Sequence, residues 1–221
     1  GVMLDESRFF FGKEKVKQLL EMMSLHKLNV FHWHLTDDPG WRIEIKQYPK
    51  LTTVGGLGHE LNPDAPAQYY TQRDIQEIVE FAAARFIQVI PEVDMPGHAR
   101  AANRAYPQFS GGGSKSHPEF TFNPGKEETY GYLTNILREV TTLFPSQYIH
   151  MGGDEVHFGN EKWQSLPEVK ELMKREKLDD LKAVETYFVR RMADSIRMLD
   201  KTVIGWDEIV DHKLNAHHSV V

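Results

Sequence analysis

The chain has 221 residues, 40% hydrophobic and 26% charged, which is the composition of one ordinary soluble domain. Its formal net charge of -6, with no basic run that could neutralise phosphates, argues against nucleic acid as a partner. The lack of cysteine excludes disulfides and thiolate zinc sites, and no apolar run approaches the roughly 20 residues that span a bilayer. Because Gly1 opens directly into a strand-like segment, the start looks like a domain cut, and the compartment stays open.

Strand and helix patterns alternate from the first residues to the last. Short apolar runs predict strands at Val2–Asp5, Leu28–Leu35, Phe86–Val93, Tyr148–Met151, Thr202–Trp206 and Ser219–Val221. Apolar residues at helical spacing predict helices at Lys13–His26, Gln72–Arg85, Lys126–Phe144, Pro167–Lys177 and Ala183–Leu199. Thr71 followed by Asp74 is typical of a capping box, which would open the second of these helices.

Strands separated by helices predict a parallel sheet covered by helices, either doubly wound or a barrel. Polar residues follow most strands, at Asp5 to Arg8, Thr36 to Asp38, Asp94 to His98, Asp154 with Glu155, and Trp206 to Glu208. A ring of strand ends that carry chemistry is typical of a (β/α)8 TIM barrel, so we expect an α/β fold of this type. The long segments Pro39–Tyr70 and Met95–Pro124 fall on the same side and could wall a cleft.

Only about six βα units can be counted, because the last strand candidate stops at the final residue. We therefore expect residues 1–221 to form one partial barrel domain that lacks two βα units, with no second domain. An open barrel leaves strand edges unpaired, which favours self-association.

The most informative stretch is His150–Glu155, with the sequence HMGGDE, in which an apolar strand runs into two glycines and two adjacent carboxylates. The glycines permit backbone angles closed to other residues and remove side chains beside the acids. A structural turn with a helix N-cap carboxylate is the plainer interpretation. Consecutive strand residues point to opposite faces, so Asp154 and Glu155 are not expected to flank one scissile bond as in an ordinary glycosidase. One of two neighbouring carboxylates in a dry cleft should keep a proton, and the longer Glu155 is the better proton donor.

Five strings, in this order and spacing, resemble the catalytic barrel of family 20 β-N-acetylhexosaminidases. They are Gly1–Arg8, Phe31–Arg42, Val89–His98, His150–Val156 and Gly205–Glu208, so the match runs the length of the chain. The resemblance implies an exo-acting glycoside hydrolase that releases terminal, non-reducing β-linked N-acetylglucosamine or N-acetylgalactosamine from oligosaccharides or glycoconjugates. It implies no cofactor, no metal and no membrane span, and a glycan-degrading enzyme favours a periplasmic or secreted location.

The resemblance also implies roles for the two adjacent acids. Glu155 would protonate the leaving oxygen and later activate water, while Asp154 would orient and stabilise the 2-acetamido group of the substrate. The carbonyl oxygen of that group would attack the anomeric carbon, giving a cyclic oxazolinium ion and retention of configuration. Substrate-assisted chemistry of this kind is an exception to the two-carboxylate scheme, and it requires no protein nucleophile.

Two further matches concern substrate binding. By the resemblance, Arg8 would hydrogen-bond the 3- and 4-hydroxyls of the terminal sugar through its guanidinium fork; the alternative is an ion pair with Asp5 or Glu6. Trp206 would wall the acetamido pocket, and the alternative for it is a core tryptophan.

Four more residues are implied to support the acid. Asp37 and His98 match a polar pair that tunes the proton affinity of Glu155, although a lone histidine is more often structural. Asp94 and His150 are expected to belong to the same supporting shell.

Two other classes of function stay open. A metal-dependent barrel hydrolase would use His32, His34, His98 and Asp154 around a divalent ion, whereas we expect His32 and His34 to be packed interior residues. A non-catalytic sugar-binding barrel, or a partial barrel completed by a partner, is favoured by the two missing units. For the same reason the isolated 221-residue chain is expected to have little or no hexosaminidase activity, and the parent protein to have it.

Overall fold

The computed structural model describes residues 1–214 and 219–220, and its centre is a parallel β-sheet. The strands lie in the order β1, β2, β3, β6, β7, β8, and each pairs in parallel with its neighbours. They are β1 (Val2–Asp5), β2 (Val30–His34), β3 (Gln88–Glu92), β6 (Tyr148–His150), β7 (Thr202–Ile204) and β8 (Ser219–Val220). All six predicted strands are present, and their bounds lie within two residues of the prediction. Val221, predicted to end the last strand, lies outside the described residues.

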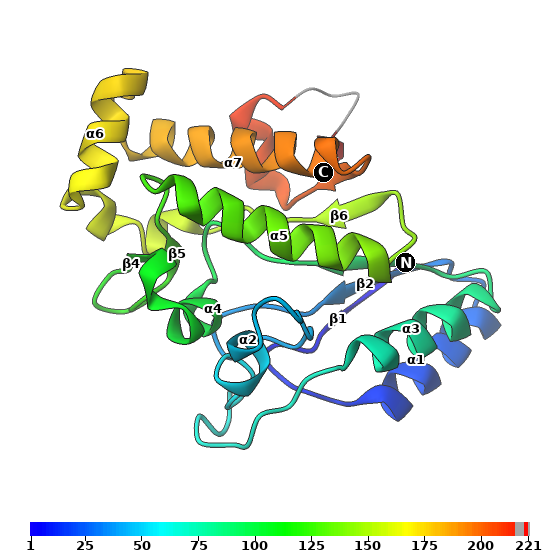
Figure 1. Cartoon of the computed structure of the whole chain (residues 1–221). Coiled ribbons are helices and arrows are strands. Elements are labelled where there is room, and N and C mark those ends of the chain that lie inside the picture. The colour runs from blue at the N-terminus through cyan, green and yellow to red at the C-terminus, as the bar shows by residue number, and fades with distance from the viewer. Residues whose placement is uncertain (215–218, 221) are drawn as a thin grey trace.

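Long helices follow the strands along the chain. They are α1 (Lys13–Leu25), α3 (Gln72–Ala83), α5 (Glu127–Leu143), α6 (Pro167–Glu176) and α7 (Leu181–Met198), as the apolar period predicted. Helix α1 contacts α3, α3 contacts α5, and α5 contacts α7, so the helices succeed one another around the sheet. In Figure 1, α1 and α3 lie side by side below β1 and β2, and α5 and α7 lie above these two strands. Strands inside and helices outside, in chain order, form the wall of a TIM-type barrel.

Apolar side chains fill the space between the strands and the helices. In α1, Val16, Leu20 and Met23 share one helix face and are fully buried. Each such side chain stabilises the fold by roughly 1.5–3 kcal/mol. Thr71 and Asp74 form the predicted capping box, which satisfies backbone N–H groups at the start of α3.

A smaller apolar cluster holds the chain that follows Glu155. Its buried members are Val156, Trp163, Val169, Leu172 and Val184. They come from the 3-10 turns η2 (Val156–Phe158) and η3 (Glu161–Gln164) and from helices α6 and α7. The segment beyond Glu155 is thus anchored against two helices.

The two long segments predicted as loops carry short elements that the sequence did not reveal. These are α2 (Lys50–Thr53), α4 (Arg100–Ala105), the 3-10 turn η1 (Pro107–Phe109), and the antiparallel pair β4 (Ser110–Gly112) and β5 (Thr121–Phe122). Elements of two to six residues are too short to show a hydrophobic period, which explains why only loops were predicted.

Arg42 fastens the first of these segments to the end of strand β1. Its side chain is fully buried, and burial lowers its pKa to about 10. It donates hydrogen bonds of 2.8–3.1 Å to the backbone carbonyls of Glu6, Ser7, Gly56, Gly58 and Gln68. One rigid guanidinium therefore joins three stretches of backbone beside the carboxyl end of the sheet.

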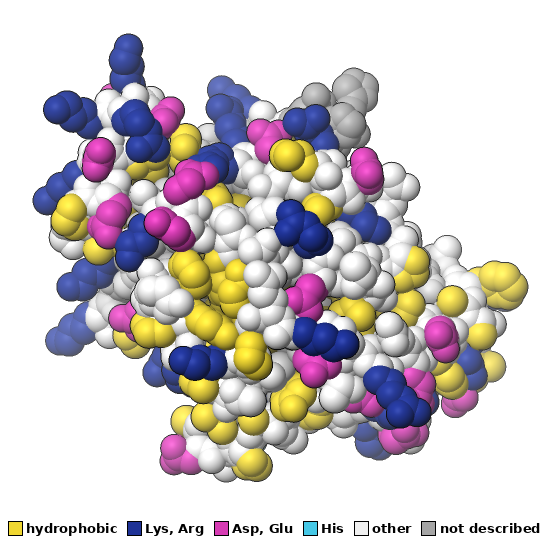
Figure 2. Space-filling view, viewed as in Figure 1, with side chains coloured by type: hydrophobic (Ala, Val, Ile, Leu, Met, Phe, Trp, Pro, Cys, Tyr) yellow, Lys and Arg dark blue, Asp and Glu magenta, His cyan; other side chains and the backbone are white. Residues whose placement is uncertain are grey.

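The surface carries charges of both signs. On the face in Figure 2, Lys and Arg side chains gather at the upper left over α6, with acidic side chains among them. Helix α6 itself carries Glu168, Glu171 and Glu176 beside Lys170, Lys174 and Arg175. A membrane-crossing helix would need a longer apolar stretch than any helix in the described part of the chain offers.

Candidate active site

Polar residues lie together at one end of the parallel sheet, and most of them were predicted for the site. Asp5 ends β1, Asp37 follows β2, Glu92 ends β3, Asp154 follows β6, and Trp206 follows β7. Since the carboxyl ends of parallel strands share one edge, these side chains gather there.

A row of polar contacts crosses this edge from Arg8 to Glu155. Arg8 Nη2 lies 2.8 Å from Asp37 Oδ2, and Asp37 Oδ1 lies 2.9 Å from His98 Nδ1. The other ring nitrogen of His98, Nε2, lies 3.4 Å from Glu155 Oε2 and 3.6 Å from Asp154 Oδ2. The structure therefore brings five of the eight predicted site residues into one connected row.

The charges in this row follow from burial and pairing. Burial lowers the pKa of His98, but the carboxylates of Asp154 and Asp37 outweigh burial and raise it to about 12. Burial raises the pKa of Asp37, but His98 and Arg8 outweigh it and hold the pKa below its usual range. His98 is thus a cation and Asp37 an anion near neutral pH. Arg8 also forms an ion pair with Asp5, with 2.6 Å between Nη1 and Oδ2. This is the ion pair that the alternative interpretation of Arg8 predicted.

The prediction that Asp154 and Glu155 point to opposite faces of a strand is wrong. Strand β6 ends at His150, and the backbone then turns through Gly152 (φ 69°) and Gly153 (φ 90°). Glu155 itself has φ 53°, in the left-handed region, and its side chain makes no capping hydrogen bond. Strand alternation does not apply to such a turn, so both carboxylates approach the same imidazole.

Asp94 lies beneath this turn and gathers with His98 and Asp154, as predicted. Complete burial raises the pKa of Asp94 well above its usual range, and the charges of Glu92 and Asp154 act in the same direction. A Cβ on Gly152 would lie 1.7 Å from Asp94 Oδ1, so only glycine fits there. Oδ1 of Asp94 and Oδ1 of Asp154 are both buried and have no hydrogen-bond partner among the described residues. Two buried carboxyl oxygens therefore lack a hydrogen bond within the described part of the protein, which is uncommon for buried polar atoms.

Glu92 is a site residue that the sequence analysis missed. Its side chain is fully buried, with Oε2 2.5 Å from His32 Nε2 and Oε1 3.1 Å from both His150 Nδ1 and Trp206 Nε1. Burial raises the pKa of Glu92, but His150 and His32 outweigh it and hold the pKa well below its usual range. The available signal was a charged residue inside the apolar string Val89–His98, since a buried charge needs dedicated partners.

His150, predicted for the supporting shell, has its ring in a second cluster with His32 and Glu92, and its Nδ1 accepts a hydrogen bond of 3.1 Å from the N–H of Gly152 in the turn that carries the acids. It pairs with Glu92 in the parallel register of β3 and β6, and its ring stacks on His32 with 4.4 Å between centroids. The ring of Trp206 lies 5.0 Å from that of His150, and Trp206 is half-buried two residues beyond the end of β7. His150 is thus a strand residue that faces this second cluster, and its supporting role stays a prediction.

The residues of the metal-site alternative do not converge on one point. Among the described residues, His98 and Asp154 gather with Asp94, whereas His32 gathers with Glu92 and His150. His34 Nε2 contacts the Thr36 carbonyl at 3.0 Å. His32 and His34 are both hydrogen-bonded, as expected for packed residues.

A cavity of about 210 Å³ opens beside Glu155. It is lined by residues of the polar row, by Pro39 and Glu60 of one long segment, and by His117 and Phe120 of the other. Both long segments thus wall the site, as predicted.

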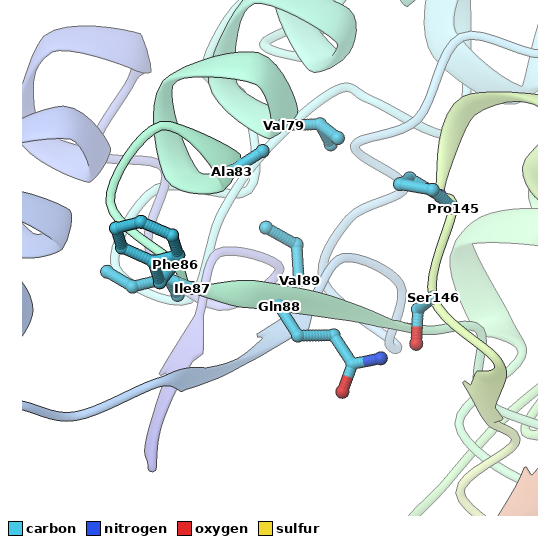
Figure 3. A pocket seen from close by; sticks show the side chains of 8 residues that line it. All are labelled: Val79, Ala83, Phe86, Ile87, Gln88, Val89, Pro145 and Ser146. Atoms are coloured by element: carbon cyan, nitrogen blue, oxygen red, sulfur yellow. The ribbon is translucent and has the colours of Figure 1, made fainter.

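The opposite end of the sheet carries a different cavity. An apolar hollow of about 370 Å³ lies between helix α3, the start of β3 and the chain just before β6. Figure 3 shows Val79 and Ala83 on the helix, Val89 on the strand, and Pro145 across from them. None of the eight residues that line it carries an ionisable side chain, so this hollow itself offers no acid–base group.

Comparison with known proteins shows the family of the chain. The sequence model of glycosyl hydrolase family 20, catalytic domain, matches residues 1–221. A beta-hexosaminidase from Porphyromonas gingivalis is 38% identical over all of this chain, which covers 29% of that relative. An exo β-N-acetylglucosaminidase from Vibrio harveyi, solved with N-acetylglucosamine, superposes with a TM-score of 0.86 at 36% identity, over 93% of this chain and 35% of that one. A β-N-acetylhexosaminidase from Bacteroides fragilis gives 0.84 at 39% identity, over 94% and 41%.

A parallel barrel wall with polar residues gathered at its carboxyl end is the architecture of a TIM-type catalytic domain. The chain belongs to glycosyl hydrolase family 20. It spans between 29% and 41% of the length of the relatives named above.

Proposed function

We propose that the protein is an exo-acting glycoside hydrolase that releases terminal β-linked N-acetylhexosamine by a retaining, substrate-assisted mechanism. The observation that carries the proposal is the approach of Asp154 and Glu155 to a single nitrogen of His98, at 3.6 and 3.4 Å. In the two-carboxylate scheme, the proton donor and the nucleophile lie on opposite sides of the sugar. Two acids that approach the same imidazole nitrogen suit a different pair of roles, namely a proton donor and a carboxylate that orients the acetamido group. The Vibrio harveyi relative solved with N-acetylglucosamine supports the choice of sugar.

Glu155 is suited to act as the proton donor. Its side chain is 46% exposed, against 20% for Asp154, so it can reach both the leaving oxygen and an incoming water. It first gives its proton to the oxygen of the breaking bond and then takes one from the water that attacks the anomeric carbon.

Asp154 is suited to hold the acetamido group of the substrate. Its side chain is 20% exposed beside His98, so the carboxylate can accept the acetamido N–H. That hydrogen bond aims the carbonyl oxygen at the anomeric carbon, which forms a C–O bond as the bond to the leaving oxygen breaks. The resulting oxazolinium carries positive charge next to an aspartate, and this electrostatic stabilisation lowers the barrier.

Arg8 and Trp206 complete the binding of the terminal sugar. The side chain of Arg8 is 39% exposed and lines the cavity, so its planar fork can serve vicinal hydroxyl groups. Trp206 donates its indole N–H to Glu92, which fixes the ring that would wall the acetamido pocket.

The test compares an aryl N-acetyl-β-glucosaminide with the plain aryl β-glucoside, in the protein that carries this chain. Only the first should be hydrolysed, because only it contains the attacking oxygen. Asp154→Asn should lower kcat on it by about 10²-fold, because the acetamido group loses its anionic partner. Equal cleavage of both substrates would contradict substrate assistance.

A further inference from the structure

The carboxylate of Glu92 contacts three ring side chains from different parts of the barrel. Its Oε2 lies 2.5 Å from His32 Nε2 on β2, and its Oε1 lies 3.1 Å from both His150 Nδ1 on β6 and Trp206 Nε1 beyond β7. Glu92 is fully buried at the end of β3, in the middle of the sheet. Burying a carboxylate is costly unless it is hydrogen-bonded, so these contacts account for its place inside the barrel.

The three rings form one continuous surface. Between centroids, His32 lies 4.4 Å from His150, His150 lies 5.0 Å from Trp206, and Trp206 lies 5.6 Å from His32. Trp206 is half-buried and the side chain of His32 is 18% exposed, whereas Glu92 has no exposed surface. A ligand at this end of the sheet can therefore touch the rings but not the carboxylate.

Trp206 is held at two points. Its backbone N–H donates to the carbonyl of Gly152 at 2.9 Å, which joins it to the turn that carries Asp154 and Glu155, and its indole N–H donates to Glu92 Oε1. An indole has one polar group and can only donate, so the direction of the ring depends on an acceptor at this place. Without that acceptor the N–H would lose its partner inside the protein, and the ring would turn to reach water.

We infer that Glu92 is a positioning residue, which holds the Trp206 ring where it limits the length of the N-acyl group that the enzyme accepts. The inference rests on the proposed function, in which Trp206 walls the acetamido pocket, and it adds what fixes that wall. One extra methylene in a closely fitting apolar pocket changes rates about 10–200-fold. The pocket should therefore favour N-acetyl over N-propionyl substrates only while the ring is fixed.

The kinetic test compares two aryl β-glucosaminides that differ by one methylene, the N-acetyl and the N-propionyl compound, in the protein that carries this chain. The selectivity is the ratio of their kcat/KM values, which does not depend on how much of the protein is folded. Glu92→Leu, which offers no acceptor, should lower this ratio about tenfold. Glu92→Gln should lower it less than about threefold, because its amide oxygen can still accept from the indole although the charge is lost. An unchanged ratio in Glu92→Leu, or equal losses in the two variants, would overturn the inference.

Glu185→Leu is the matched control. Glu185 on α7 is a second buried carboxylate, and its Oε1 lies 3.1 Å from Nε2 of the buried His212. Its replacement removes a buried charge in the same way but leaves the Trp206 indole its acceptor, so the ratio should stay within about 1.5-fold. A similar fall of the ratio in this variant would mean that any loosening of the interior changes the selectivity, and would overturn the specific role of Glu92.

A double-mutant cycle tests whether Glu92 acts through the indole. Trp206→Phe removes the N–H and keeps an aromatic ring. In this background, Glu92→Leu should change the ratio by less than about twofold, because no hydrogen bond is left to lose. If the effects of the two substitutions multiply, Glu92 acts independently of Trp206 and the inference is overturned.

A binding measurement separates this inference from the proposed function. In a Glu155→Gln protein, calorimetry should find that N-acetylglucosamine binds about tenfold more tightly than N-propionylglucosamine, and that adding Glu92→Leu removes the difference. If the unmodified protein hydrolyses neither aryl substrate but this preference is present and depends on Glu92, the proposed function is wrong and the inference stands. Equal affinity for the two sugars before Glu92 is changed would overturn the inference, whatever the turnover.

Discussion

Two buried histidine–carboxylate pairs in this molecule share their chemistry and differ in their surroundings. His98 Nδ1 lies 2.9 Å from Asp37 Oδ1, and His212 Nε2 lies 3.1 Å from Glu185 Oε1. Both histidines are buried. In each pair burial raises the pKa of the carboxyl group, but the histidine together with a nearby cation, Arg8 beside Asp37 and Lys182 beside Glu185, outweighs burial and holds the pKa below its usual range.

The difference lies at the second ring nitrogen. His98 Nε2 faces Asp154 and Glu155 beside a cavity, whereas His212 Nδ1 contacts Thr186 Oγ1 at 2.9 Å inside the packing against helix α7. A buried ion pair by itself indicates only a satisfied interior. The candidate site is distinguished by a histidine whose outer edge meets acids that solvent can reach.

The strongest way to sharpen this comparison is to neutralise one carboxyl group near each histidine. Glu155→Gln keeps the side-chain size but holds no transferable proton, so kcat on a disaccharide should fall by about 10³-fold. Glu185→Gln should leave kcat/KM within about twofold and lower the free energy of unfolding by about 1–3 kcal/mol, because His212 loses its charged partner. Steady-state kinetics and chemical denaturation measure the two effects. A comparable loss of activity in both variants would erase the distinction.

The protonation of His98 offers a second test. Its pKa is raised to about 12 from an unfolded value of about 6.5, so between these values the folded protein holds a proton that the unfolded chain has released. The stabilisation is complete below about pH 6.5 and is lost as the pH rises toward about 12. His98→Gln should lower the free energy of unfolding at neutral pH by about 1–3 kcal/mol and flatten its decline in alkaline solution. Denaturation curves across the alkaline range check this, and an unchanged slope in the variant would refute it.

The smallest effects compare two glycines, one in the site and one outside it. A Cβ on Gly152 (φ 69°) would meet Asp94 Oδ1 at 1.7 Å, whereas a Cβ on Gly131 in α5 has nothing within 4 Å. Gly152→Ala should lower the free energy of unfolding by about 1–3 kcal/mol and reduce kcat, because Asp94 must move. Gly131→Ala should raise the free energy of unfolding by about 0.5–1 kcal/mol at unchanged kcat. Thermal unfolding of both variants measures these changes. A change of the same sign in the free energy of unfolding of both variants would contradict the prediction.

Local signals were sufficient for the frame of the fold. The apolar runs and the helical period placed all six strands and the long helices, and Thr71 with Asp74 marked the start of α3 correctly. Residues that follow parallel strands gather at the carboxyl edge of the sheet. This placed Arg8, Asp37 and His98 correctly at the same edge as the acids.

Contacts that depend on turn geometry or on register could not be predicted in this way. The direction of Asp154 and Glu155 was wrong because positive φ angles at Gly152 and Gly153 replace the strand alternation. The partners of Glu92 follow from the pairing of β3 with its neighbours, which periodicity along one strand does not contain. The functional roles of these residues stay predictions until the variants are measured.

The hydrogen bonds of Arg42 bear on how a ligand arrives. Because five carbonyls from three stretches of backbone share one buried cation, the segment that carries Pro39 and Glu60 behaves as a fixed rim. A sugar chain should therefore meet a preshaped mouth on this side. Its capture should depend on diffusion and solvent viscosity, with no slow opening step contributed by this part of the barrel.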